Sequence, residues 1–138
     1  MPEDLVVTTH VCRGNYHSTW ASSGGYDPIA NTLFAKENVS AYYLEYDTDR
    51  AGDFAPLAHV GEGKCVVLGL FSSKTGELED KEAIKARIEE ATQYVDINRL
   101  CISAQCGFAS TEEGNVLTEE QQWEKLRLIK EVADEVWG

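Results

Sequence analysis

Four apolar stretches, each followed by a helical pattern or by room for a short helix, constrain the fold of this chain more than any other feature. The predicted strands are 5–12, 39–47, 65–71 and 100–106. The predicted helices begin near residues 27, 53, 80 and 118. Strands that alternate with helices at roughly thirty-residue spacing are typical of parallel β/α architecture. The sequence therefore predicts an α/β fold of four consecutive βα units, which is half of an eight-stranded barrel. An open four-stranded parallel sheet is the competing shape.

Local signals support these elements. The first strand is apolar on both faces, as expected for a parallel strand that is covered on both sides. Asp27 is predicted to cap the first helix, with Pro28 at its first helical position. Thr118 and Gln121 have the spacing of a capping box, which predicts the start of the last helix.

The segment 13–26 is too long to be a simple connector, and long loops of this kind are often functional. It contains an arginine, an amide, a histidine, several hydroxyls and paired glycines. This mixture favours binding of a small polar ligand through Arg13, Asn15 or His17. A solvated surface loop is the alternative.

Length and charge narrow the class of protein. A chain of 138 residues is expected to form a single domain, 1–138. The net charge of -12 argues against nucleic acid or an anionic membrane as partner, because both bind a basic face. The sequence shows neither a signal peptide nor an apolar run of the ~20 residues that span a bilayer, so a cytoplasmic location is expected. In that reducing compartment, cysteines are metal ligands or buried side chains more often than disulfides.

Metal-binding residue types end three of the four predicted strands. His10 and Cys12 are two residues apart, so both side chains point to the same face, and Glu45 and Cys106 occupy the corresponding places in later strands. Each alone has an ordinary structural explanation, and an arginine is the alternative partner for Glu45. Together they favour zinc, and ligands dispersed over strand ends indicate a catalytic site. Cys65 and Cys101 are interpreted as core, and alternation places Cys101 away from Cys106.

The chain resembles the cobalamin-independent methionine synthase family, in its zinc-binding C-terminal catalytic barrel, and is most similar to the short methionine synthase II-like members. The segments that carry the resemblance are 10–15, 43–47, 72–74, 77–81 and 105–115. The resemblance covers essentially the whole chain and implies the C-terminal half of a TIM (β/α)8 barrel. It also implies that His10, Cys12, Glu45 and Cys106 hold a catalytic Zn2+.

The resemblance implies a 5-methyltetrahydropteroyltriglutamate-homocysteine S-methyltransferase-like activity, which belongs to methionine biosynthesis. Homocysteine and a methyl donor are the expected partners. A metal-bound thiol is deprotonated and therefore nucleophilic. Glu45 is expected to be the labile ligand and, with His17, a catalytic residue. Arg13, Asn15 and Asp47 are expected to contact the substrate.

Two departures from the family pattern leave alternatives open. Folate-dependent members have a histidine near the strand end that corresponds to 70–73, where this chain has none. The donor is therefore methyltetrahydrofolate or another compound, such as a methylcorrinoid protein. The upstream half of the barrel is also missing, so we expect a C-terminal fragment.

Two rival hypotheses follow. The first is a catalytically incomplete zinc-binding half barrel, which needs an N-terminal half or a second copy of the chain as a homodimer. The second is an open α/β redox or small-ligand domain in which Cys12 and Cys106 are reactive thiols. The second rival predicts no bound zinc, and the sequence has no CxxC motif that would favour it.

Overall fold

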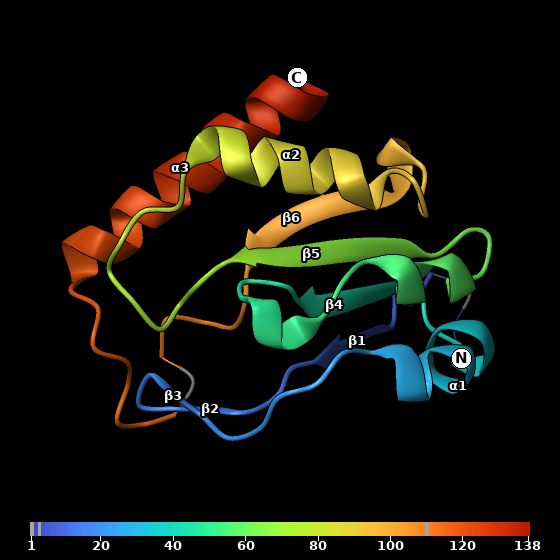
Figure 1. The fold of residues 1–138 in the computed structure, drawn as a ribbon, viewed down its shortest axis with the longest axis horizontal. Coiled ribbons are helices and arrows are strands. Elements are labelled where there is room, and N and C mark those ends of the chain that lie inside the picture. Colours follow the sequence, from blue (N-terminus) through green and yellow to red (C-terminus); the bar gives the residue numbers. More distant parts are fainter. Residues whose placement is uncertain (1, 3, 110) are drawn as a thin grey trace.

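The computed structural model describes residues 2, 4–109 and 111–138, and a four-stranded parallel sheet forms its centre (Figure 1). The strands are β1 (Thr8–Val11), β4 (Ala41–Glu45), β5 (Cys65–Phe71) and β6 (Leu100–Ala104). They lie in the order β1-β4-β5-β6, and every neighbouring pair is parallel. The predicted parallel α/β architecture is confirmed, and β1 and β6 form the two edges of the sheet.

Within the described residues, three α-helices and three short 3-10 helices connect and cover the strands. They are α1 (Asp27–Lys36), α2 (Lys81–Ala91), α3 (Glu119–Trp137), η1 (Asp49–Ala51), η2 (Ala55–His59) and η3 (Ile97–Arg99). The capping box of α3 forms as predicted between Thr118 and Gln121. The predicted cap of α1 is one residue off, because Tyr26 occupies the N-cap position and Asp27 is already helical. In the described part of the chain, no helix has both the length and the apolar composition needed to cross a bilayer.

The two faces of the sheet differ in exposure. Tyr42 and Leu44 of β4 are buried in a core that includes aromatic contacts, with ring centroids 5.2 Å apart for Phe34 and Tyr42. His10, Tyr43 and Cys101 belong to one row of paired positions that runs across the sheet, and this row lies on the opposite face. The side chains of these three residues are exposed. The expectation that β1 is covered on both sides is therefore wrong for this chain.

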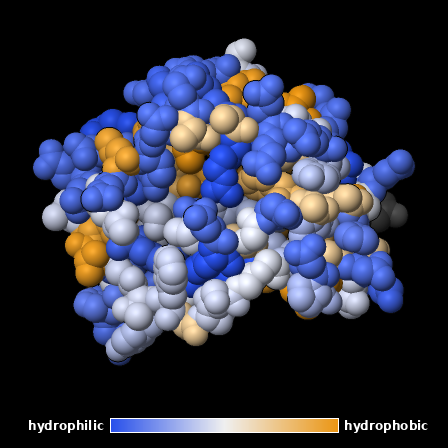
Figure 2. Space-filling model, in the orientation of Figure 1, coloured by the Kyte–Doolittle hydropathy of each residue, from blue (hydrophilic) through white to orange (hydrophobic). Residues whose placement is uncertain are grey.

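The outer surface seen in Figure 2 is mostly hydrophilic, and its hydrophobic side chains form small separate groups. This distribution agrees with the net charge of -12, because charged side chains lie at the surface and make it hydrophilic.

The segment 13–26, predicted as a loop, contains an antiparallel hairpin of β2 (Asn15–Tyr16) and β3 (Thr19–Trp20). His17 and Ser18 form its two-residue turn, with φ values of 46° and 59°. Such turns need positive φ at both positions, for which asparagine and glycine are the usual signal. The turn has neither residue, so the hairpin has no strong local signal in the sequence.

Gly69 in the middle of β5 allows a neighbouring segment to cross this strand. A Cβ atom at this position would lie 2.7 Å from the Leu44 carbonyl oxygen and 2.9 Å from the Gln105 Cα atom. The chain after β6 uses this space, and the Gln105 backbone N–H donates to the Phe71 carbonyl oxygen at 2.8 Å. The absent side chain therefore lets residues after β6 reach toward β4.

Gly69→Ala is expected to lower the free energy of unfolding by about 1–3 kcal/mol, because the added methyl group forces backbone atoms apart. Urea denaturation measures the loss. Gly61→Ala is the matched control, since a Cβ there would meet only the flexible Lys64 side chain, at 3.6 Å. Equal stability of the two variants would contradict the crossing at Gly69.

Candidate metal centre

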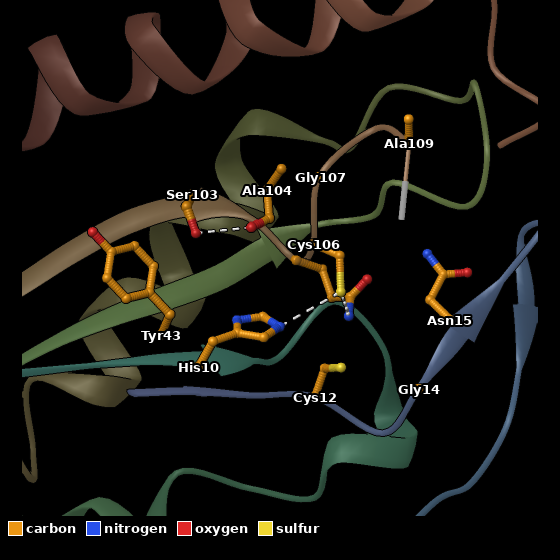
Figure 3. Close-up of a pocket in the computed structure, with 11 residues that line it drawn as sticks. His10, Cys12, Gly14, Asn15, Tyr43, Ser103, Ala104, Cys106, Gly107 and Ala109 are labelled. Carbon is orange, nitrogen blue, oxygen red and sulfur yellow. Dashed lines mark hydrogen bonds between the residues drawn. The ribbon is translucent and has the colours of Figure 1, made fainter. Parts of the chain in front are cut away.

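Three side chains from the two edge strands meet at the carboxyl end of the sheet. His10 belongs to β1, Cys12 directly follows β1, and Cys106 lies two residues after β6. Their ligand atoms all lie within 4.8 Å of one another, and His10 Nε2 is 3.7 Å from Cys106 Sγ (Figure 3). Tetrahedral zinc with its usual bond lengths places such ligand atoms about 3.5–3.8 Å apart. The three donors therefore are of the types that zinc binds, and the His10–Cys106 pair has the spacing that zinc requires.

A pocket of about 770 Å³ opens beside this cluster. His10, Cys12 and Cys106 line it, together with the predicted substrate contact Asn15 and with Tyr43, as Figure 3 shows. A small molecule in this pocket would therefore lie against the candidate ligands.

Glu45 lies beside the described His10, Cys12 and Cys106 group and is not part of it. Its side chain is fully buried and forms an ion pair with Arg50, which is also buried. Its Oε2 atom accepts hydrogen bonds from the Arg13 backbone N–H at 3.1 Å and from Gln105 Nε2 at 2.7 Å. The structure thus brings three of the four predicted ligands together, and an arginine faces the fourth.

A buried polar network connects Glu45 to a lysine that sequence analysis did not single out. Lys74 Nζ lies 3.0 Å from Asp47 Oδ2 and donates to Gln105 Oε1 at 2.6 Å. The predicted substrate contact Asp47 therefore pairs with Lys74, and its side chain is fully buried. Gln105 and Lys74 were missed as site residues, although the position of Gln105 next to Cys106 was a usable signal.

The other predicted site residues have contacts of their own. Arg13 donates to the Gly24 carbonyl oxygen at 2.6 Å, and its guanidinium lies 4.1 Å from the centre of the Tyr26 ring. Arg13 Nη1 also donates to the carbonyl oxygen of Glu45 in β4 at 3.3 Å, which connects the segment 13–26 to the sheet. His17 is exposed at the turn of the β2–β3 hairpin. The substrate role of Arg13 and the catalytic role of His17 stay predictions.

Burial, and after it the neighbouring Cys12, raise the pKa of the Cys106 thiol to about 12, although Lys74 acts to lower it. At neutral pH such a thiol keeps its proton. A bound cation reverses this preference, because coordination deprotonates a thiol outright. The cluster is thus suited to take up a metal ion with release of protons.

The remaining cysteines do not both belong to the core. Cys65 is half-buried and Cys101 is exposed, so the core assignment of Cys101 is wrong. The reason is that Cys101 stands in the same cross-strand row as His10, on the exposed face of the sheet. All four cysteines are free.

The fold and the site together define a parallel α/β protein with a candidate metal centre at the carboxyl ends of its strands. Residues 3–135 match the family model described as cobalamin-independent synthase, catalytic domain, and the chain belongs to this family.

Similar proteins are longer than this chain. Two Bacillus subtilis (strain 168) proteins, named uncharacterized protein YxjH and uncharacterized protein YxjG, are each 56% identical to it over 137 residues. These residues are 99% of this chain and 36% of each relative. The chain therefore spans little more than a third of the curated relatives it matches.

Two solved structures have the same fold. The putative vitamin-B12 independent methionine synthase from Listeria monocytogenes matches with a TM-score of 0.70 and 40% identity, over 99% of this chain and 36% of that protein. The B12-independent methionine synthase from Shewanella sp. W3-18-1, solved in complex with selenomethionine, matches with a TM-score of 0.74. It is 23% identical over 97% of this chain and 40% of that protein, so this second similarity concerns the fold alone.

Proposed function

We propose that this chain carries the zinc centre of a methyltransferase that transfers a methyl group to the thiol of homocysteine and forms methionine. The donor is methyltetrahydrofolate or another methyl compound. The observation that carries the proposal is the His10, Cys12 and Cys106 cluster at the wall of an open pocket. Membership of the cobalamin-independent synthase family supports a role related to methionine synthase.

The residues of the cluster fit zinc by their chemistry. One imidazole and two thiols form a borderline-soft donor set, which favours Zn2+ over Mg2+ or Ca2+. His10, Cys12 and Cys106 would hold the ion. Glu45 is the fourth candidate ligand, and its carboxylate would have to exchange its contact with Arg50 for the metal. When bound, zinc supplies a Lewis acid that favours the thiolate form of a thiol.

The methyl transfer itself is a displacement at carbon. The homocysteine thiol loses its proton, its sulfur forms a bond to the methyl carbon, and the bond between donor and methyl carbon breaks with its electron pair left on the donor. The chain contributes the pocket in which these atoms meet, with Asn15 as the proposed amide contact to the substrate. Tyr43 lines the same pocket on the side of β4.

A second candidate function is a zinc-binding half barrel that is active only with another half. The relatives are nearly three times longer, and β1 and β6 form the edges of the described sheet. Strand edges pair readily with further strands. A separate N-terminal half or a second copy of this chain would then complete the TIM barrel.

Metal analysis of the purified chain, paired with single-turnover methylation of homocysteine, tests both functions. Methyltetrahydrofolate and methylcobalamin are offered in parallel as donors. Zinc together with methyl transfer would support the first function and identify the donor. Zinc without transfer would support the half barrel, and absence of zinc would overturn both.

Zinc affinity is expected to fall as the pH decreases from about 8 to about 5.5, because each thiol ligand must release a proton on binding. The raised pKa of Cys106 makes this competition stronger, since protons then hold the free thiol more firmly. Competition against a chromophoric chelator measures the affinity at each pH. A flat profile would argue against thiolate ligands.

A further inference from the structure

We propose that Gln105 is a positioning residue of this metal centre. Its side chain holds the Cys106 sulfur and the Glu45 carboxylate in a fixed relation and connects both groups to the charge of Lys74. The inference rests on the proposed function, because it assumes that Cys106 is a metal ligand. It adds a residue that is not itself a ligand.

The charged groups around Gln105 determine how its amide is oriented. Lys74 Nζ can only donate, and it lies 2.6 Å from one end of the amide, which must therefore be the oxygen. An ionised carboxylate can only accept, and Glu45 Oε2 lies 2.7 Å from the other end, which must be the nitrogen. The NH2 group therefore faces both Glu45 and Cys106.

The amide has no room to turn away from these partners. Gln105 is 2% exposed. The Gln105 Nε2 atom lies 2.8 Å from Cys106 Sγ, and this contact uses the second hydrogen of the NH2 group. The Gln105 Oε1 atom also accepts a hydrogen bond from Ser73 Oγ at 3.4 Å. The backbone of Gln105 is held as well, by the hydrogen bond to the Phe71 carbonyl oxygen. Both hydrogens and both acceptor directions of the amide are thus in use.

The hydrogen bond from Gln105 would stabilise negative charge on the Cys106 sulfur when a metal ion is bound there. A hydrogen bond from an N–H group stabilises a thiolate, and the partners of metal ligands commonly set their orientation and donor strength. The ammonium of Lys74 polarises the amide from its oxygen side, and Asp47 holds that ammonium in place. The geometry forms one line of contacts from Asp47 through Lys74 and Gln105 to Cys106.

Cobalt binding by the full chain tests the role of Gln105. Co2+ replaces zinc as the probe, since its thiolate-to-metal charge-transfer band reports on the sulfur electrons. Gln105→Leu keeps a similar volume but removes the amide, and we expect about 10–100-fold weaker binding. We also expect the band to shift to longer wavelength, because sulfur without the hydrogen bond holds its electrons less tightly. Gln93→Leu, which replaces an exposed glutamine, is the matched control and should leave the Co2+ affinity and the charge-transfer band unchanged.

A folded Gln105→Leu variant with the affinity and the band of the wild type would overturn the inference and leave the proposed function intact. If circular dichroism shows that Gln105→Leu does not fold, the charge-transfer band of the Lys74→Gln variant with bound Co2+ tests the inference instead. That variant keeps N–H donors for Gln105 and Asp47 but removes the charge. A smaller shift in the same direction supports the inference, and an unchanged band overturns it. A wild-type chain that binds no Co2+ or Zn2+ would overturn the inference and the proposed function together.

Discussion

Cys106→Ser is expected to reduce the zinc content of the purified chain from about one ion per chain to none, because a serine hydroxyl is not an established zinc ligand. Cys106 is the contribution of β6 to the cluster, and its Sγ lies within 4.8 Å of the other two ligand atoms. Loss of this donor leaves His10 and Cys12 as the remaining members of the cluster, and both come from β1 and the residue that follows it. His10→Ala is expected to have the same effect. Elemental analysis of protein purified without chelators measures the zinc content.

Cys101→Ser is the matched control for this experiment. Cys101 lies in the same strand region but is exposed and outside the cluster, so its replacement should leave about one zinc per chain. If Cys106→Ser and His10→Ala both keep the zinc content of the wild type, the candidate site is not where the metal binds.

Arg50→Met is expected to lower the free energy of unfolding by about 3–5 kcal/mol, because it leaves the buried Glu45 carboxylate without its positive partner. Arg50 is itself buried, and it also donates to the Ser22 carbonyl oxygen at 2.9 Å and stacks on Trp20 at 4.7 Å. The hairpin segment would therefore loosen together with the ion pair. Urea denaturation of metal-free protein measures the change.

Two further variants make this second experiment specific. Arg127→Met removes an exposed arginine and should change stability by about 0.5 kcal/mol or less. The double variant Glu45→Gln with Arg50→Met should recover much of the loss, since no uncompensated carboxylate is left. A loss for Arg50→Met as small as that for Arg127→Met would show that the ion pair contributes little.

The contacts of Glu45 bear on its proposed role as the labile ligand. In the structure, Arg50, the Arg13 backbone and Gln105 all hold its carboxylate at the border of the cluster. In the proposed role, a carboxylate held in this way would have a charged partner both on and off the metal. Exchange between the two would keep its charge compensated throughout, which is the physical requirement for a ligand that leaves and returns.

The sequence by itself determined the parallel α/β class, the approximate positions of the four strands, and the start of α3. These features depend on local patterns, namely apolar runs of strand length and the spacing of Thr118 and Gln121. The same local logic found His10, Cys12 and Cys106, because parallel strands place their carboxyl ends at one edge of a sheet.

Only the tertiary structure decided which of these side chains meet. The place of Gln105 between Cys106 and Lys74 depends on the close approach of the chain after β6 to Gly69 of β5. The pairing of Glu45 with Arg50 depends on how the segment after β4 folds back over the end of that strand. The exposure of Cys101 depends on which face of the sheet is covered. Periodicity gives the face of a residue within its own strand. The partner of a buried charge is decided by the folded chain, because burial is tolerated only where the fold brings an opposite charge or a hydrogen bond to that group.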